Sequence, residues 1–236
     1  MSSMGKSFLI RDLVFQASAA MGIAAKNIAY TFSHCLEAVG NPAAMAPLHT
    51  AGGSAVQLTA GADSTGGVFQ TYTATGGTDI GCVYGNRSGR ASDHRKLFCA
   101  ARIKFVGTAA AGAYSMIGWS DDSGIGTLGS DQFTIGQIHA GSATNIVLLK
   151  GNAGTPTYVD TGVSSAAGTW RTVKFGCNEG VVTGSVDSTQ FSTTVTGIGT
   201  SANEWLPSWV CGNGGVTAAR NLYADWVFWA SKASEG

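Results

Sequence analysis

Three aspartates stand where their side-chain oxygens could bind a metal ion. Asp121 and Asp122 begin an Asp-Asp-Ser-Gly segment, and Asp131 follows after a short Gly-rich stretch. Carboxylate oxygens at the rim of a loop are ligands that suit Ca²⁺. The same composition is typical of a solvated turn, which is the interpretation we favour. We therefore expect no cofactor, with calcium at these three residues as the alternative.

A second group of polar residues surrounds a tryptophan. Asn203, Glu204 and Trp205 follow a Gly/Thr/Ser loop. An indole face can stack on the apolar face of a pyranose, while an amide and a carboxylate hydrogen-bond its hydroxyls. We expect this triplet to be exposed and to be the best candidate for binding a glycan, whereas most of the six tryptophans should lie in a core.

The densest basic run of the chain consists of Arg87, Arg90, Arg95 and Lys96. It is either a solvated loop or a surface that docks on an acidic partner. No aromatic residue is interleaved with these side chains to stack on bases, so we do not expect it to bind nucleic acid.

Other motifs of catalysis fail on their context. The segment from Gly124 to Gly129 matches a dinucleotide fingerprint in letters, but a strand-like run follows it where a phosphate-binding helix would be needed. The four histidines are isolated from one another and from the cysteines, and no G-x-S-x-G elbow occurs. We expect a protein that is not an enzyme.

Composition favours association. Charged residues make up 12% of the 236-residue chain, about half of the usual ~25%, and basic and acidic side chains balance to a net charge of zero. Little self-repulsion then keeps copies apart, so a homo-oligomer is expected. The balance favours neither nucleic acid nor an anionic membrane.

The five cysteines are scattered and form no C-x-x-C pair, so no disulfide framework or zinc knuckle is predicted. Cys99 and Cys177 alternate with apolar residues and should be small buried hydrophobes. This use of cysteine suits folding in a reducing cytoplasm.

Short alternating runs separated by Gly-rich turns predict an all-β antiparallel sandwich. Trp170 opens one of these strands, and we expect it to be largely buried. We also expect Trp226 and Trp229, three positions apart, to lie on opposite faces of the last strand. The predicted strands are 55–59, 68–74, 97–106, 113–120, 132–139, 145–150, 157–163, 170–177, 181–187, 190–196, 208–211 and 222–230.

The first 45 residues form a different kind of segment, Ala-rich and apolar. Helical spacing predicts one or two helices, split at Gly22, and an extended arm is the alternative. A signal peptide would also fit residues 13–25, but polar residues dilute that run. We expect this segment to dock on a neighbouring subunit, or on the shell of a larger particle, through Phe8, Leu13, Ile28 and Phe32. The predicted organisation is an arm at 1–45, a Gly/Thr-rich connecting region at 46–94 and a sandwich at 95–236.

Several strand motifs resemble those of concanavalin A-like, laminin-G-like jelly rolls. They are Leu97–Phe105, Met116–Asp121, Gly168–Phe175, Gly184–Asp187 and Leu222–Phe228. The resemblance covers residues 95 to 230 and implies a jelly-roll fold. The β-glucanases of this superfold carry a Glu-x-Asp-x-Glu strand motif, which this chain lacks.

The overall composition, poor in charged residues and rich in Gly, Thr and Ala, also resembles that of tailed-bacteriophage virion proteins. That resemblance implies a noncatalytic capsid decoration or fibre-like component, located in the virion and assembled in the host cytoplasm. Its partners would be other virion proteins, such as the major capsid protein. The alternative is a lectin module that binds a cell-surface glycan.

Overall fold

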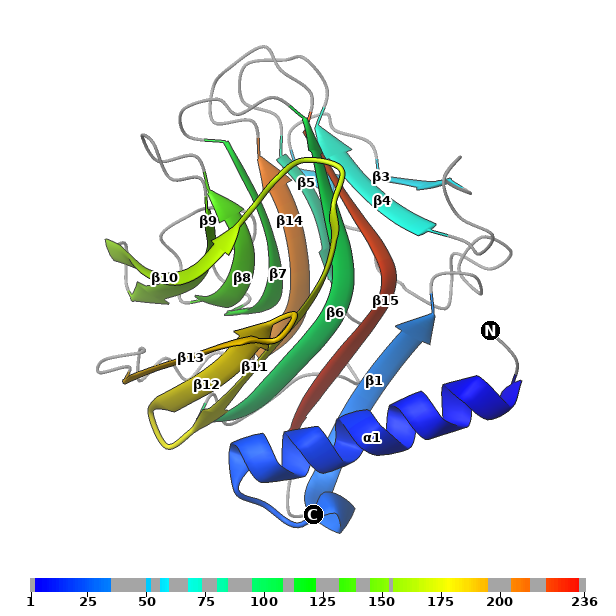
Figure 1. Cartoon of the computed structure of the whole chain (residues 1–236), viewed down its shortest axis with the longest axis vertical. Helices are drawn as coiled ribbons and strands as arrows, with labels where there is room; N and C mark the ends of the chain where they lie inside the picture. The colour runs from blue at the N-terminus through cyan, green and yellow to red at the C-terminus, as the bar shows by residue number, and fades with distance from the viewer. Residues whose placement is uncertain are drawn as a thin grey trace.

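Alternating apolar residues build two antiparallel sheets that pack face to face (Figure 1). The computed structural model describes residues 3–34, 50–51, 56–59, 68–73, 80–84, 95–107, 113–121, 132–138, 145–152, 155–194, 205–212 and 220–233. A helix, α1 (Ser3–Met21), and a 3-10 turn (Ala25–Asn27) precede the strands. These are β1 (Ile28–His34), β2 (Thr50–Ala51), β3 (Val56–Thr59), β4 (Val68–Thr73), β5 (Ile80–Tyr84), β6 (Lys96–Gly107), β7 (Tyr114–Asp121), β8 (Gln132–Ile138), β9 (Asn145–Asn152), β10 (Thr155–Ser164), β11 (Trp170–Asn178), β12 (Val181–Val186), β13 (Thr189–Thr194), β14 (Trp205–Gly212) and β15 (Arg220–Lys232).

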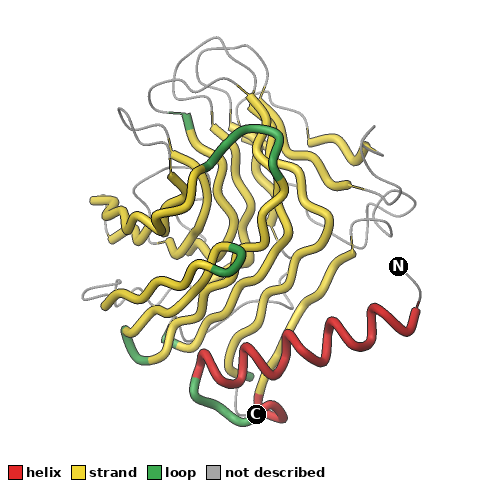
Figure 2. Tube along the Cα trace, in the orientation of Figure 1, coloured by secondary structure: helices red, strands yellow, loops and turns green. Residues whose placement is uncertain are grey.

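The first sheet, sheet A, has the order β13-β12-β11-β6-β15-β4-β3, and β1 also pairs with β15. The second, sheet B, has the order β10-β9-β8-β7-β14-β5-β2. Strands dominate the trace, and the long helix α1 lies outside the sandwich (Figure 2). The predicted all-β antiparallel sandwich is confirmed.

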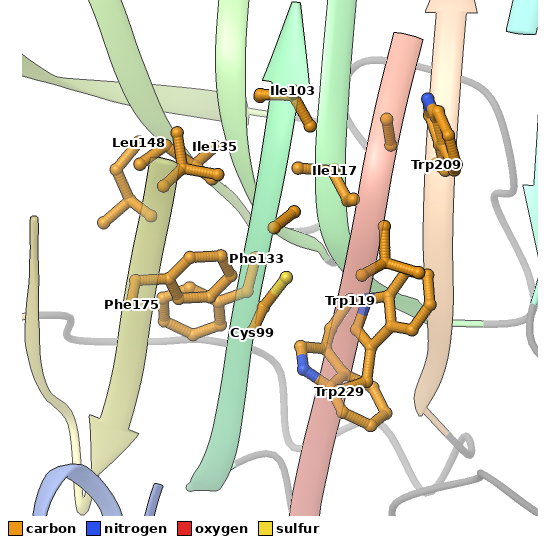
Figure 3. Close-up of a cluster of buried hydrophobic side chains, with 14 of the residues drawn as sticks. Cys99, Ile103, Ile117, Trp119, Phe133, Ile135, Leu148, Phe175, Trp209 and Trp229 are labelled. Carbon is orange, nitrogen blue, oxygen red and sulfur yellow. The ribbon is translucent and has the colours of Figure 1, made fainter. Parts of the chain in front are cut away.

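The inner faces of the two sheets form the core between them. Three large aromatic side chains, Trp119, Phe133 and Phe175, are fully buried there (Figure 3). Two indoles satisfy their N–H groups across the core, since Trp119 Nε1 donates to the Phe98 carbonyl at 3.0 Å and Trp229 Nε1 donates to the Gly118 carbonyl at 2.8 Å. These bonds tie sheet A to sheet B at fixed heights along the strands.

The buried cysteines behave as the sequence predicts. Cys99 and Cys177 lie in the core as thiols outside any disulfide, as does Cys211. Burial raises the pKa of the Cys99 thiol, so this group stays protonated and unreactive.

The N-terminal segment packs on its own sandwich. Leu13, Ala17 and Met21 of α1 are buried against the outer face of sheet A. The expectation that Leu13 docks on a neighbouring subunit is therefore wrong, because the helix already buries this side chain within the chain. Ile28 and Phe32 are half-buried and pack against the same cluster.

Gly22 splits the N-terminal segment, as predicted. Its φ of +63° is a left-handed conformation that favours glycine, and it ends the helix. The chain then enters β1, which pairs with β15 in register from Ile28 opposite Lys232 to His34 opposite Trp226. Residues 28–34 thus adopt the extended alternative, and they belong to sheet A. No helix among the described residues is long and apolar enough to cross a membrane.

Leu13→Ala should destabilise the protein by about 2 to 5 kcal/mol, because the change leaves a cavity under α1. Phe15→Ala, two residues away on the exposed side of the same helix, should change the free energy of unfolding by less than about 1 kcal/mol. Leu13 is 1% exposed and Phe15 is 60% exposed. Urea unfolding of both variants measures the difference, and equal effects would show that α1 does not pack on sheet A as described.

Candidate functional site

The outer face of sheet A has a covered part and an open part. Helix α1 lies across the lower ends of the strands in Figure 1 and buries Phe98, Trp226 and Phe228 beneath it. Farther along the same strands the outer side chains become polar or charged, notably Arg102 and Lys104 on β6. The candidate site lies at the boundary between the two parts.

Lys96 fixes the end of the helix on the sheet. Its ammonium donates to the Met21 carbonyl at 3.0 Å, hydrogen-bonds Asn178 Oδ1 and lies 3.3 Å from Glu179 Oε1. A cation at a helix C-terminus also offsets the partial negative charge of the last carbonyls. Gly176 lets the helix approach closely, because a Cβ there would lie 2.6 Å from the Cβ of Ala20.

A groove of about 620 Å³ runs between α1 and the hairpin β12–β13. Its apolar side chains are Ala19 and Ala20 of the helix and Phe98 of β6. Phe175 and Phe191 also border the groove, but their rings lie on the inner side of sheet A, in or against the core. The polar lining carries mostly hydroxyl and amide groups: Gln16, Lys174, Thr183, Ser185, Gln190 and Ser192.

A row of aromatic and cationic side chains crosses the open part of the face. Trp170 on β11, Lys104 on β6 and Tyr223 on β15 are opposite one another in register. The Lys104 ammonium lies 5.1 Å from the centroid of each aromatic ring, between them. Arg102, on the same side of β6, lies 5.0 Å from the Trp170 ring centroid. We call these four residues the aromatic-cation row.

The two cations of the row differ in exposure. Lys104 is 7% exposed, so cation–π contacts hold a largely buried ammonium. The Arg102 side chain is 44% exposed, and its Nη1 donates to Asp225 Oδ2 at 2.6 Å. Asp225 stands at the register shift between Ala224 and Trp226, where a β-bulge directs its side chain toward Arg102.

A second cleft, of about 580 Å³, lies between α1 and β1 and is lined by Ile10, Arg11, Val14, Phe15 and Tyr30. It is apolar apart from Arg11, whose guanidinium lies 5.5 Å from the Phe8 ring centroid. Phe8, which the sequence assigned to docking, is 59% exposed beside it.

Two tryptophan predictions are wrong. Trp205 is fully buried, because it shares the core-facing side of β14 with Trp209 and Cys211. It cannot serve as an exposed glycan platform. Trp170 is half-buried on the outer face, since its position on β11 has the opposite parity to Val173 and Phe175. Strand alternation could have revealed both.

The prediction for the last strand is confirmed. Trp226 lies under α1, whereas Trp229 lies in the core between the sheets.

The remaining predicted site residues are brought together only in part. Arg95 lies 3.6 Å from Glu179 at the surface, and Lys96 holds α1. Asp121 ends β7, opposite Trp205 in register. Asp122, Asp131, Asn203, Glu204, Arg87 and Arg90 lie outside the described residues, so the calcium prediction and most of the basic-run prediction stay predictions. Within the described residues, no three His, Cys, Asp or Glu side chains gather as metal ligands would.

No protein-family model matches this chain, and no curated protein sequence matches it. Solved structures do. A protein of unknown function from Shewanella oneidensis is similar with a TM-score of 0.59 at 13% identity, over 89% of this chain and 88% of that one. The Crh5 transglycosylase in complex with NAG has a TM-score of 0.56 at 14% identity, covering 87% and 84%. The carbohydrate recognition domain of Emp47p has a TM-score of 0.51 at 12% identity, covering 77% and 88%.

These likenesses bear on the fold. Their low identity carries no residue assignments, but their coverage shows that this chain shares a jelly-roll sandwich fold with them. The predicted fold is thus confirmed.

Trp170 should dominate the quenching of tryptophan fluorescence by acrylamide. The chain has six tryptophans, and the other five, Trp119, Trp205, Trp209, Trp226 and Trp229, are buried. Trp170→Phe should therefore remove most of the quenchable emission, while the melting temperature stays close to that of the unaltered chain. If quenching is unchanged in the variant, the open part of the face is not as the structure describes it.

Proposed function

We propose that this protein is a noncatalytic carbohydrate-binding module and that the groove between α1 and β12–β13 binds the sugar. The carrying observation is the composition of the groove lining, in which hydroxyl and amide side chains surround an apolar surface formed by Phe98, Ala19 and Ala20. Binding sites for small ligands combine an apolar surface with a few polar groups that fix orientation. The volume of about 620 Å³ lies within the range of such sites.

The chemistry of the lining suits a sugar. Thr183, Ser185 and Ser192 offer hydroxyl groups that both donate and accept hydrogen bonds, and Gln16 and Gln190 add amides. Sugar hydroxyls have the same dual character. The apolar lining matches the C–H face of a pyranose ring, so one bound ring can satisfy both kinds of surface.

The charges near the groove support a binding role without catalysis. Hydrolysis of a glycosidic bond ordinarily needs two carboxyl groups about 5 to 10 Å apart. Among the described residues that line the groove, the charged side chain is a lysine, Lys174. Asp187 and Asp225 of sheet A are engaged in ion pairs with Arg171 and Arg102, and Asp12 of α1 accepts a hydrogen bond from Gln16.

Similar structures give further support. One is named as a carbohydrate recognition domain and another was solved as a transglycosylase with NAG. These two likenesses support the proposal that this jelly roll binds sugar, and the groove lining supplies the argument from the site itself.

A second candidate function rests on the other side of α1. We propose that this side docks the protein into a larger assembly, with a surface component of a tailed-phage virion as the assembly that the sequence style suggests. Phe8, Phe15 and Tyr30 are all more than half exposed there, on a chain with zero net charge. Helices that are apolar on both sides are usually covered on both.

The groove can be tested with a bulky side chain. Ser192→Trp should fill the groove and abolish binding on a glycan array, because Ser192 is exposed and lines it. Thr194→Trp is the matched control, since Thr194 is exposed on the same strand and is not among the lining residues. Equal binding by both variants would refute the groove as the sugar site, and no binding by the unaltered protein would refute the function.

Docking can be tested with a charge. Phe15→Glu should leave the melting temperature within a few degrees of that of the unaltered chain, because the side chain is exposed. It should prevent self-association or incorporation into particles, measured by light scattering and by mass spectrometry of purified particles. Unimpaired assembly of this variant would contradict docking through this side of α1.

A further inference from the structure

The aromatic-cation row is a surface that the groove does not use. Its four members come from three neighbouring strands and are held in register by the sheet. The Trp170 ring rests against Lys104 and Arg102 and is still partly exposed. A flat aromatic surface held by packed neighbours is preorganised, so little side-chain entropy is lost when a ligand stacks on it.

We propose that the aromatic-cation row binds the acidic residue of a polysaccharide, a uronic acid. The Trp170 ring stacks on the sugar, and the Arg102 guanidinium binds the carboxylate. This inference rests on the proposed glycan-binding function and specifies which class of glycan the protein takes.

Arg102 is suited to the carboxylate. A guanidinium has five N–H donors in a planar fork that matches a carboxylate, and the bond to Asp225 uses Nη1. The bulge that holds Asp225 on one side of Arg102 also fixes the direction of the fork. Lys104 adds a second positive charge beneath the indole, which makes this part of the surface attractive to an anion.

The row favours a single acidic group over a nucleic acid. Binding of nucleic acid depends on neutralising several phosphates along a backbone. Here Asp225 offsets Arg102, Asp187 offsets Arg171, and the whole chain has no net charge. Arg102 and Lys104 together exceed the charge of Asp225 by one, so the row can neutralise one ligand carboxylate beside one stacked ring.

The position of the row fits a ligand that also reaches the groove. Trp170 and Lys174 lie on the same face of β11, four residues apart, and Lys174 lines the groove. Four residues of strand span about 13 Å, a distance that a short oligosaccharide can bridge. The groove then holds neighbouring sugars while the row selects the acidic one.

The test uses the full chain and a panel of uronate-containing oligosaccharides, each paired with its carboxyl-reduced form. The unaltered protein should bind at least one uronate form about tenfold or more tightly than its reduced partner, as charge-assisted hydrogen bonds predict. Trp170→Ala should weaken binding of both forms, and Arg102→Gln should remove the preference for the acid. Asp225→Asn should increase that preference, because it leaves the Arg102 charge uncompensated.

Arg95→Gln is the control. This variant also removes one arginine charge, but from an exposed residue just before the first residue of β6. It should leave the preference for the acidic glycan unchanged. Binding to glycans with equal affinity for acid and reduced forms would overturn this inference and leave the proposed function standing. Binding to no glycan would overturn both, and tight binding to a single-stranded oligonucleotide in place of the uronates would overturn the inference in favour of nucleic acid.

Discussion

Strand β15 is apolar on both faces, and most of the architecture follows from that constraint. Its inner side presents Leu222, Val227 and Trp229 to the core, and sheet B covers them. Its outer side presents Trp226 and Phe228, which would be exposed if sheet A faced water. A sandwich has no third layer to cover such residues, so the chain supplies α1 for this purpose.

Helix α1 covers only part of the length of β15, and the surface that we propose binds the ligand begins where this cover ends. The β-bulge at Asp225 marks the change on β15, because Trp226 and Phe228 on one side of it are buried under α1, whereas Tyr223 on the other side belongs to the aromatic-cation row. The helix forms one wall of the groove, and Arg102 and Lys104 pack against the Trp170 ring. The placement of α1 thus buries the outer-face aromatic residues of sheet A and also borders the face that we propose binds the ligand.

The sequence predicts the sandwich well because strand alternation is a local signal. The predicted strand at 132–139 is observed as β8, and that at 222–230 as β15. The sequence does not decide between a helix and a strand for residues 28–34, because Ile28 and Phe32 also fit helical spacing. The partner strand β15 lies about 200 residues further along the chain, so no local pattern indicates the pairing. The sequence does not predict the groove, because its lining joins α1 to strands that lie far along the chain. Trp205 was misplaced by its preceding loop, although its parity with Trp209 indicated the core.

The central claim, that the outer face of sheet A binds the ligand beside α1, can be tested on the indole N–H resonances of ¹⁵N-labelled protein. Six tryptophans give six such resonances, and that of Trp170 is identified by its absence from Trp170→Phe. Addition of a bound uronate oligosaccharide should shift the Trp170 resonance and leave the resonances of the core tryptophans in place. A bound oligosaccharide that leaves the Trp170 resonance unmoved would contradict the account.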